Sequence, residues 1–411
     1  MATAAGTAVT LNLTNFDAML KEIYPDVRVE SLAMRKRPLL EWFDRKDDWY
    51  GDAYVVPVLY EDPQGYSETL SVALTSAETT KQVKFVSTQR AHGYQVVKLT
   101  AEAVIAASKD IGSFIKAKET QFSGALRNCG KQLHLQLYRG QGAKGTIASI
   151  TNANPSVITL MVKSDAYNFG IGETLMADDT ATGASPRATR SKVAGRDAAA
   201  GTITMDSNAV ADASWAANDV LFTDGDPTYR VRGLNDWLPI VAPSATTFLG
   251  VDRTADIQGL SGHRVDNTGR SLIENGEELA MQIGEFGGEP DAWFMNPRAG
   301  LQLAEDLGAK VTRSDGGHGK FGFSGFTLEH FVTGPISVVF DTGCPANRSY
   351  MLQKNTWRFS HMQQVPHLVR DDGRDSIRGT TTDTVEYRWR WFGDLFCEKP
   401  GYNGVCSVAV A

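Results

Sequence analysis

The chain has 411 residues, a length that accommodates two or three domains, each able to bury its own hydrophobic core. Hydrophobic residues make up 42% of it and charged residues 22%, as in ordinary soluble globular proteins. The formal net charge of -7 excludes a nucleic-acid reader that grips its target through a strongly basic surface, so DNA beside this protein would be held by shape or enclosure.

The four cysteines, Cys129, Cys344, Cys397 and Cys406, are widely spaced and include no CxxC pair. This spacing suits neither a zinc site nor a disulfide scaffold, so we predict buried thiols in a reducing cytosol. There is also no signal-peptide pattern, and no stretch approaches the roughly 18 apolar residues that a membrane span requires. We therefore expect a cytosolic protein without membrane contact.

The N-terminal half begins with two segments that have little core of their own. Residues 1–48 predict a polar arm, in which Asn15 caps a short helix from Phe16. Residues 49–99 contain two runs rich in Val, Tyr and Thr that flank a more polar stretch, GYSETLSVALTSAETT. This pattern predicts a long extended hairpin with a polar tip. Because few of its residues could fill a private core, we expect this hairpin to find partners on another molecule.

Residues 100–144 predict one long helix. After Thr100 as N-cap, apolar residues recur in steps of three, four or seven from Val104 to Leu137. At about 1.5 Å per residue, such a helix would be roughly 55–60 Å long and would serve as a spine. The stretch RGQGAKGT, at 139–146, is interpreted as a helix stop and linker.

The composition changes at residues 145–226, where short strands alternate with turns rich in Gly, Asp and Asn. This pattern predicts a small inserted β-barrel or β-sandwich. The remainder, 227–411, has an α/β pattern. It includes an amphipathic helix at 271–286, a strand at 291–295, and a helix with Asn296 as N-cap, Pro297 at its first position and Gly308 as its stop.

The final predicted strand lies within VEYRWRWFGDLFCEKPGYN, at 385–403. Its period of two places Val385, Tyr387, Trp389 and Trp391 on one face and Glu386, Arg388 and Arg390 on the other. Two hypotheses follow. In the first, the strand lies in the core with a solvated charged face; in the second, it presents its arginines to a neighbouring subunit or a packaged genome, and both can hold at once.

Several motifs that would indicate chemistry are incomplete. Gly317, Gly319 and Gly322 spell GxGxxG, but the strand, helix and acidic residue of a dinucleotide site are missing, so we predict a flexible loop. Ser324 fails the GxSxG pattern, because Phe326 replaces the second glycine.

Metal and modification motifs are equally weak. Pro366 lies between His361 and His367, so they cannot form a helical ligand pair. The acidic turns at 177–183 and 222–227 do not match a calcium loop. The sequons at Asn12 and Asn347 carry no meaning without a signal peptide. We therefore predict no catalytic, cofactor-binding or metal-binding residues, no cofactor and no enzymatic activity.

The order of these parts resembles the major capsid protein of tailed bacteriophages, with its Hong Kong 97-type fold. The resemblance covers roughly residues 30–405 and rests on the order of the elements, since no single stretch is a strict signature. Three stretches match family habits: HGYQVVKLTAEAVIAAS, EPDAWFMNPRAGLQLAEDL and EYRWRWFGDLFCEKPGYNGV. The insertion at about 145–226 departs from the minimal fold.

The resemblance implies an α+β fold with a defined set of parts. These are an N-terminal arm at 1–48, an extended loop hairpin at 49–99, a spine helix of the peripheral domain at 100–144, an inserted small β-barrel-like domain at 145–226, and the remainder of the peripheral domain with the axial α/β domain at 227–411.

The resemblance also implies a structural function. Such a protein self-assembles into pentamers and hexamers that form an icosahedral shell and enclose double-stranded DNA non-specifically. Expected partners are further copies of the chain, a scaffolding protein, a portal and a decoration protein. The expected location is the virion capsid, after assembly in the host cytoplasm.

Three alternatives remain. An encapsulin-like nanocompartment shares the shell fold, although the insertion favours a virus. A hydrolase with a β accessory domain lacks a recognisable nucleophile and base. A tail-tube or decoration protein is disfavoured by the long helix.

Overall fold

The computed structural model describes residues 37–62, 65–77, 81–100, 117–180, 185–225, 227–244, 247–267, 269–307, 326–330, 333–362, 367–369, 377–378 and 383–409. These residues form a mixed α+β structure with two compact units. The first unit comprises the described parts of His92–Leu133 and His361–Phe392, and the second comprises those of Arg37–Ala91, His134–Ser360 and Gly393–Ala411.

The first unit is organised around one long strand. Its elements are β4 (Ala91–Thr100), α5 (Ala117–Tyr138), β17 (His367–Leu368), β18 (Ile377–Arg378) and β19 (Thr384–Cys397), of which α5 and β19 continue into the second unit. Strands β17 and β18 pair antiparallel with β19, and β4 also pairs with it. Val97, Leu99, Ala125 and Trp389 form the buried core of this unit.

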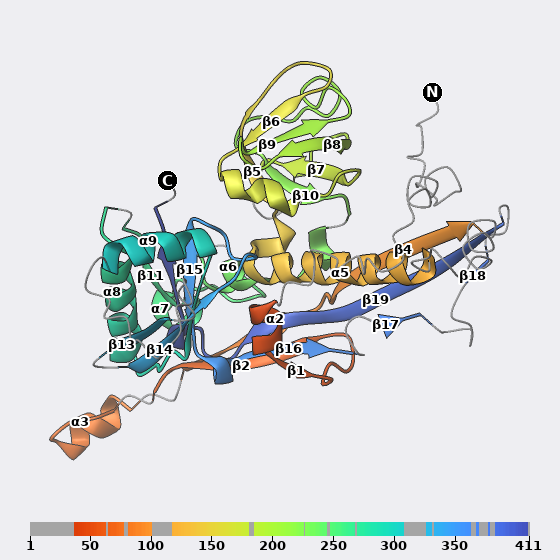
Figure 1. Cartoon of the computed structure of the whole chain (residues 1–411). Coiled ribbons are helices and arrows are strands. Elements are labelled where there is room, and N and C mark those ends of the chain that lie inside the picture. Colours follow the sequence, from red (N-terminus) through yellow and green to blue (C-terminus); the bar gives the residue numbers. More distant parts are fainter. Residues whose placement is uncertain are drawn as a thin grey trace, which may run out of the picture. The chain divides into compact units, whose positions relative to one another are not determined.

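The second unit begins with a short helix and an antiparallel ribbon. Its first elements are α2 (Pro38–Trp42), β1 (Asp44–Lys46), β2 (Tyr54–Glu61), α3 (Leu70–Thr75) and β3 (Lys81–Ser87). Strand β1 runs parallel to β16 (Trp357–His361), and β2 pairs antiparallel with β3. Helix α3 lies at the far end of the β2–β3 ribbon (Figure 1).

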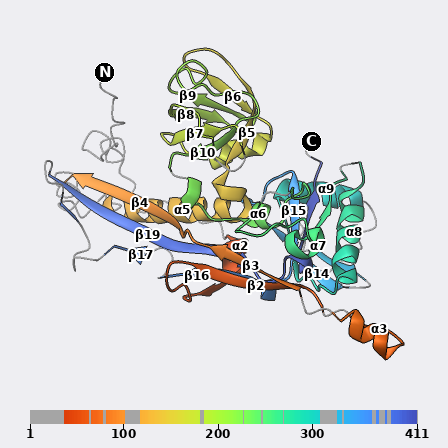
Figure 2. The ribbon, with the colours of Figure 1, turned by 180° about the vertical axis from the view of Figure 1, so that it is seen from behind.

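A closed barrel follows the end of α5. Its elements are η1 (Gly140–Gly142), β5 (Gly145–Ile150), β6 (Val157–Leu160), η2 (Lys163–Asn168), β7 (Thr174–Asp178), β8 (Ser191–Asp197), β9 (Thr202–Met205) and β10 (Val220–Thr223). Among the described residues, the strands close in the order β10-β5-β6-β9-β8-β7, shown from two sides in Figures 1 and 2. Inward-facing side chains such as Ile147, Ile158, Leu175, Ile203 and Leu221 give the barrel its own core.

The rest of the second unit is a mixed sheet with helices. Its elements are η3 (Pro227–Tyr229), α6 (Leu234–Trp237), α7 (Ile257–Ser261), β11 (His263–Val265), α8 (Leu272–Glu285), β12 (Ala292–Met295), α9 (Pro297–Leu307), β13 (Phe326–His330), β14 (Gly334–Phe340), β15 (Arg348–Leu352), η5 (Lys354–Thr356), η6 (Pro400–Tyr402) and β20 (Gly404–Ser407). The strand order is β11-β20-β15-β12-β14-β13, with β12–β14 and β11–β20 parallel.

Local signals explain the two longer helices of this sheet. A capping box begins α8, in which Ser271 Oγ accepts from the Glu274 N–H and Glu274 Oε2 accepts from the Ser271 N–H. The predicted cap at Asn296 is confirmed, since its Oδ1 accepts from the Arg298 N–H at 3.1 Å. Buried Leu279 and Ile283 of α8 contribute to a common core with the sheet.

The structure corrects three sequence predictions. In the described part of the hairpin predicted at 49–99, β2 pairs with β3, whereas β4 pairs with β19, where Val97 and Leu99 are buried beside Trp389. Its tip is not purely polar, because α3 exposes the apolar side chains of Leu70 and Leu74 there. The strand quoted above is not the last, because β20 follows it and pairs with β11 and β15.

The predicted spine helix is described from Ala117 and ends at Tyr138, so the predicted stop at 139–146 is confirmed. Its first turns, at 101–116, lie outside the described residues, as do the arm with Asn15 and the stop at Gly308. The prediction of buried free thiols is confirmed for all four cysteines.

Candidate interaction surface

The β2–β3 ribbon buries one face and exposes the other. Val56, Val58 and Phe85 are fully buried, whereas Val55 and Leu59 on the alternate face are exposed. The Phe85 ring lies 5.1 Å from the ring of Trp237. The base of the ribbon is therefore packed against the rest of its own unit, while one apolar face remains open.

The tip of the ribbon exposes a concentrated set of apolar side chains. Tyr66 is 91% exposed, Leu70 74%, Val72 53% and Leu74 70%. Helix α3 has no buried residue, and a helix of six residues is unstable without packing. Such a patch indicates a contact with another molecule. The sequence predicts a polar tip instead, because Ser, Thr and Glu dominate the stretch around Leu70, Val72 and Leu74.

Strand β19 confirms the predicted alternation over its middle. Trp389 and Trp391 are buried, whereas Arg388 is exposed. A Cβ at Gly93 would lie 2.4 Å from Nε1 of Trp391, so only glycine lets β4 approach this indole. The two tryptophans of this face are therefore part of the core, and Tyr387 packs against it half-buried.

The charged face of β19 is largely engaged within its own unit. Glu386 pairs with Lys98 at 2.8 Å and with Arg388 at 2.9 Å, and the hydrogen bonds from these two cations lower the pKa of Glu386. Arg390 Nε donates to His367 Nε2 at 3.1 Å. Of the two arginines on this face, Arg388 has the more exposed side chain, at 47%.

The weak metal motifs gain no support from geometry. His367 accepts from Arg390, and His361 lies at the end of β16. In the first acidic turn, Asp178 accepts from the N–H groups of Thr180 and Ser185, so it stabilises the turn itself. Among the described residues, no three His, Cys, Asp or Glu side chains come close enough to hold a metal ion.

The structure describes one of the remaining motif residues, Asn347. Gly317, Gly319, Gly322, Ser324 and Asn12 lie outside the described residues. Asn347 lies beside β15 and accepts a backbone hydrogen bond from Val408 at 3.0 Å.

A buried carboxylate that sequence reasoning missed joins three segments. Asp341 accepts from Tyr138 Oη at 2.9 Å, is bonded to His134 Nε2 at 2.8 Å, and accepts from the N–H groups of Gly343 and Leu39. Burial alone would raise the pKa of Asp341, but the hydrogen bonds of His134, Gly343 and Tyr138 together hold it below its ordinary value. No local signal marks Asp341, because its partners are distant in sequence.

Buried charges fix the barrel at both of its connections. On the entering side, Arg139 donates to Asp165 at 3.0 Å, and Lys144 pairs with Glu173. On the leaving side, Arg230 stacks 4.5 Å from the centre of the Phe222 ring and donates to a barrel carbonyl at 2.8 Å. The insertion is therefore firmly anchored at both ends.

None of the helices in the described part of the chain combines the length and apolar character of a membrane-spanning segment.

No family model and no curated protein matches the sequence. Among solved structures, the chain is similar to one in the cyanophage A-1(L) capsid asymmetric unit, with 12% identity, a TM-score of 0.54, and coverage of 95% of this chain and 97% of that one. It is also matched to a chain of the native GTA particle capsid (9% identity, TM-score 0.47, coverage 98% and 100%) and to one of an encapsulin complex from Synechococcus elongatus PCC 7942 (7%, 0.46, 97% and 96%). The fold of this chain is that of a phage capsid protein.

Proposed function

We propose that this chain is the major structural subunit of an icosahedral bacteriophage capsid, which assembles into pentamers and hexamers around a double-stranded DNA genome. The observation that carries the proposal is the β2–β3 ribbon, fixed at its base and apolar at its exposed tip. The likeness of the whole fold to a phage capsid chain supports it. Copies of one subunit that each offer such a tip to a different patch of a neighbour make contacts that close into rings.

In this proposal the parts have the roles of a Hong Kong 97-type subunit. Residues 1–48 are the N-terminal arm, 49–99 include the extended loop, 100–144 are the spine of the peripheral domain, and 227–411 complete the peripheral and axial domains. The barrel at 145–226 is an inserted domain. The protein has no catalytic role.

The proposed partners follow from the same role. The subunit contacts further copies of itself, a scaffolding protein, a portal and a decoration protein, and it encloses DNA without reading its sequence. Assembly takes place in the host cytoplasm and the product is the virion shell.

Electron microscopy of the purified chain, with light scattering for mass, tests this function. We expect hollow particles tens of nanometres across, or rings that precede them. DNA inside particles from infected cells would support the viral capsid function. A protein cargo inside them would instead support the encapsulin-like nanocompartment. A 44.7 kDa monomer at every salt and crowder concentration, with co-expressed scaffold included, would contradict both shell functions.

A further inference from the structure

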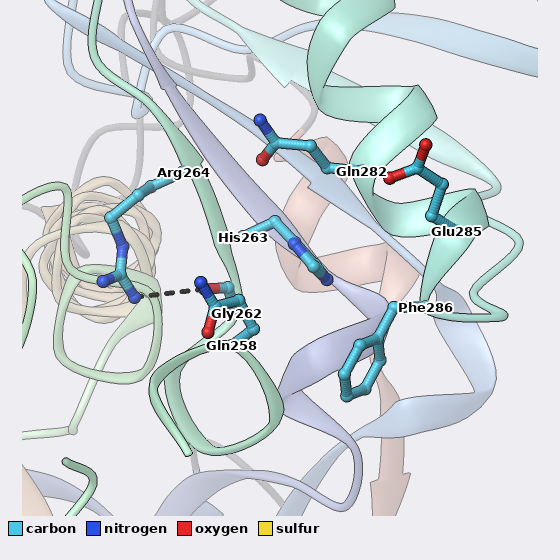
Figure 3. A pocket seen from close by; sticks show the side chains of 7 residues that line it. All are labelled: Gln258, Gly262, His263, Arg264, Gln282, Glu285 and Phe286. Atoms are coloured by element: carbon cyan, nitrogen blue, oxygen red, sulfur yellow. Dashed lines mark hydrogen bonds between the residues drawn. The ribbon is translucent and has the colours of Figure 1, made fainter. Parts of the chain in front are cut away.

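A pocket of about 420 Å³ opens between α7, β11 and the C-terminal end of α8 (Figure 3). Its walls carry charges of both signs, Arg264 and Glu285, which Figure 3 shows on opposite sides. The lining therefore favours neither an anionic nor a cationic ligand. A more definite arrangement of reactive groups lies at the end of the barrel where the chain enters and leaves it.

Lys144 is the one buried lysine in the described part of the chain, with its side chain 2% exposed. Its N–H donates to the Leu221 carbonyl at 2.8 Å, and its own carbonyl accepts from Arg139 Nη1 and Asn168 Nδ2, each at 2.9 Å. Its ammonium group contacts the carboxylate of Glu173, the residue that directly precedes β7. A rigid frame therefore holds this nitrogen against this carboxyl group.

The surroundings of Lys144 oppose its positive charge. Burial lowers the pKa of Lys144, the Glu173 carboxylate offsets part of this, and the charge of Arg230 lowers the pKa again. Arg230 is itself held in place, because it donates to the Thr223 carbonyl at 2.8 Å and stacks on the Phe222 ring. A lysine that is desolvated beside another cation passes its proton to an acid more readily, and the neutral amine that results is a nucleophile.

Two further donors orient the carboxyl group of Glu173. Thr223 Oγ1 donates to Oε1 at 2.7 Å, and the Gly170 N–H donates to Oε2 at 3.0 Å. When the amine attacks Cδ, negative charge develops on Oε2, where the Gly170 N–H stabilises it. Oε1 contacts both the lysine nitrogen and the Thr223 hydroxyl, so it is the oxygen that leaves. The Glu173 side chain is 14% exposed, which gives the departing oxygen a way to solvent.

We propose that Lys144 and Glu173 form an intramolecular amide bond within the barrel. The bond between Nζ and Cδ forms, and the bond between Cδ and Oε1 breaks. Two protons of the ammonium group leave with Oε1 as water and the third stays on the amide nitrogen, so atoms and charge balance without a further reactant. The ion pair in the structure is the reactant state, and its fixed contact supplies the high effective concentration that amide formation in water requires.

The amide crosslinks two strands across a third. Strands β5 and β7 both pair with β10, and Lys144 and Glu173 lie 29 positions apart beside the starts of β5 and β7. The bond removes a pair of buried charges and restricts the unfolded barrel, as a disulfide would. It closes the end through which the chain enters and leaves the barrel. Because the reaction needs a single chain, it is independent of the proposed assembly.

Intact-mass spectrometry of the denatured full chain tests the proposal. We expect a mass below that of the sequence by one water molecule, about 18 Da. A tryptic map should contain a branched peptide that joins the segments around Lys144 and Glu173, uncleaved after Lys144 because trypsin does not accept an acylated lysine. The map is required because cyclisation of an Asp-Gly pair such as Asp224–Gly225 also releases water.

Two arginine variants provide the controls. Lys144→Arg keeps the cation but has a guanidinium that stays protonated, so this variant should have its full sequence mass. The matched change Lys163→Arg, at an exposed lysine of the barrel, should keep the mass deficit and the branched peptide. A full sequence mass for the unmodified chain, a deficit without the branched peptide, or a deficit that persists in K144R would each overturn the proposal. The first two results come from the unmodified chain, so a variant that fails to fold does not affect them.

Discussion

The apolar tip of the β2–β3 ribbon can be tested without disturbing the subunit that carries it. Changing Leu70, Val72 and Leu74 together to glutamine removes the apolar surface of α3. Glutamine is a good helix former, so the local backbone preference is retained. Because no residue of α3 is buried, the free energy of unfolding should change by no more than about 0.5 kcal/mol.

The effect on association follows from the exposed fractions. Full burial of a leucine or valine side chain contributes about 1.5–3 kcal/mol. At 74% and 70% exposure, Leu70 and Leu74 each have about 1–2 kcal/mol still to gain, and Val72 at 53% has about 1 kcal/mol. The triple variant should therefore lose about 3–5 kcal/mol per tip contact, or roughly 10²- to 10⁴-fold in association constant.

Light scattering against protein concentration measures this loss as a rise in the concentration at which particles form. The matched control is Leu70→Met with Leu74→Met, which keeps apolar volume and should assemble as the unmodified chain does. If the glutamine variant assembles at the unmodified concentration, the tip makes no subunit contact. If its unfolding free energy falls by several kcal/mol, the tip is packed on its own subunit.

Three further outcomes are expected. Asp341→Asn should lower the free energy of unfolding by about 2–4 kcal/mol at pH 7, as measured by urea titration. Because the pKa of Asp341 is depressed in the folded protein, the stabilisation by its carboxylate is lost as the pH falls through that pKa. The difference in unfolding free energy between the unmodified protein and the variant should therefore vanish in acid. A gap that is constant with pH would show that the carboxylate charge plays no part. Gly93→Ala should lower stability by about 1–3 kcal/mol in thermal melts through its clash with Trp391, and an unchanged melt would mean that β4 can move aside. Emptied particles should retain DNA weakly even at low salt, because the subunit has a net charge of -7, and strong, salt-sensitive retention would contradict this.

The elements that could be predicted were those with short-range signals. The alternation of residue types with period two predicted strand β19, and the Asn-Pro pair predicted the start of α9. The composition of the turns predicted short strands in the insertion. The predictions failed where the position of a strand or side chain depends on a partner that is distant in sequence. Strand β4 has the same Val-rich pattern as β2 and β3, and only burial beside Trp389 separates it from them. The four donors to Asp341 come from residues as far away as Leu39, a contact that no local pattern encodes.

The inserted barrel and the hairpin are extensions of opposite physical character. The barrel closes its own hydrogen-bond ladder, fills its interior and anchors both connections with buried charges, so its fold requires no neighbour. The hairpin buries Val56, Val58 and Phe85 near its base, whereas its tip is apolar and exposed. In the proposed shell, burial of this tip would give copies of the chain a free-energy reason to associate through the hairpin. The barrel also exposes apolar side chains, Met161 at 53% and Ile171 at 69%, so its place in the proposed assembly depends on what its outer surface contacts.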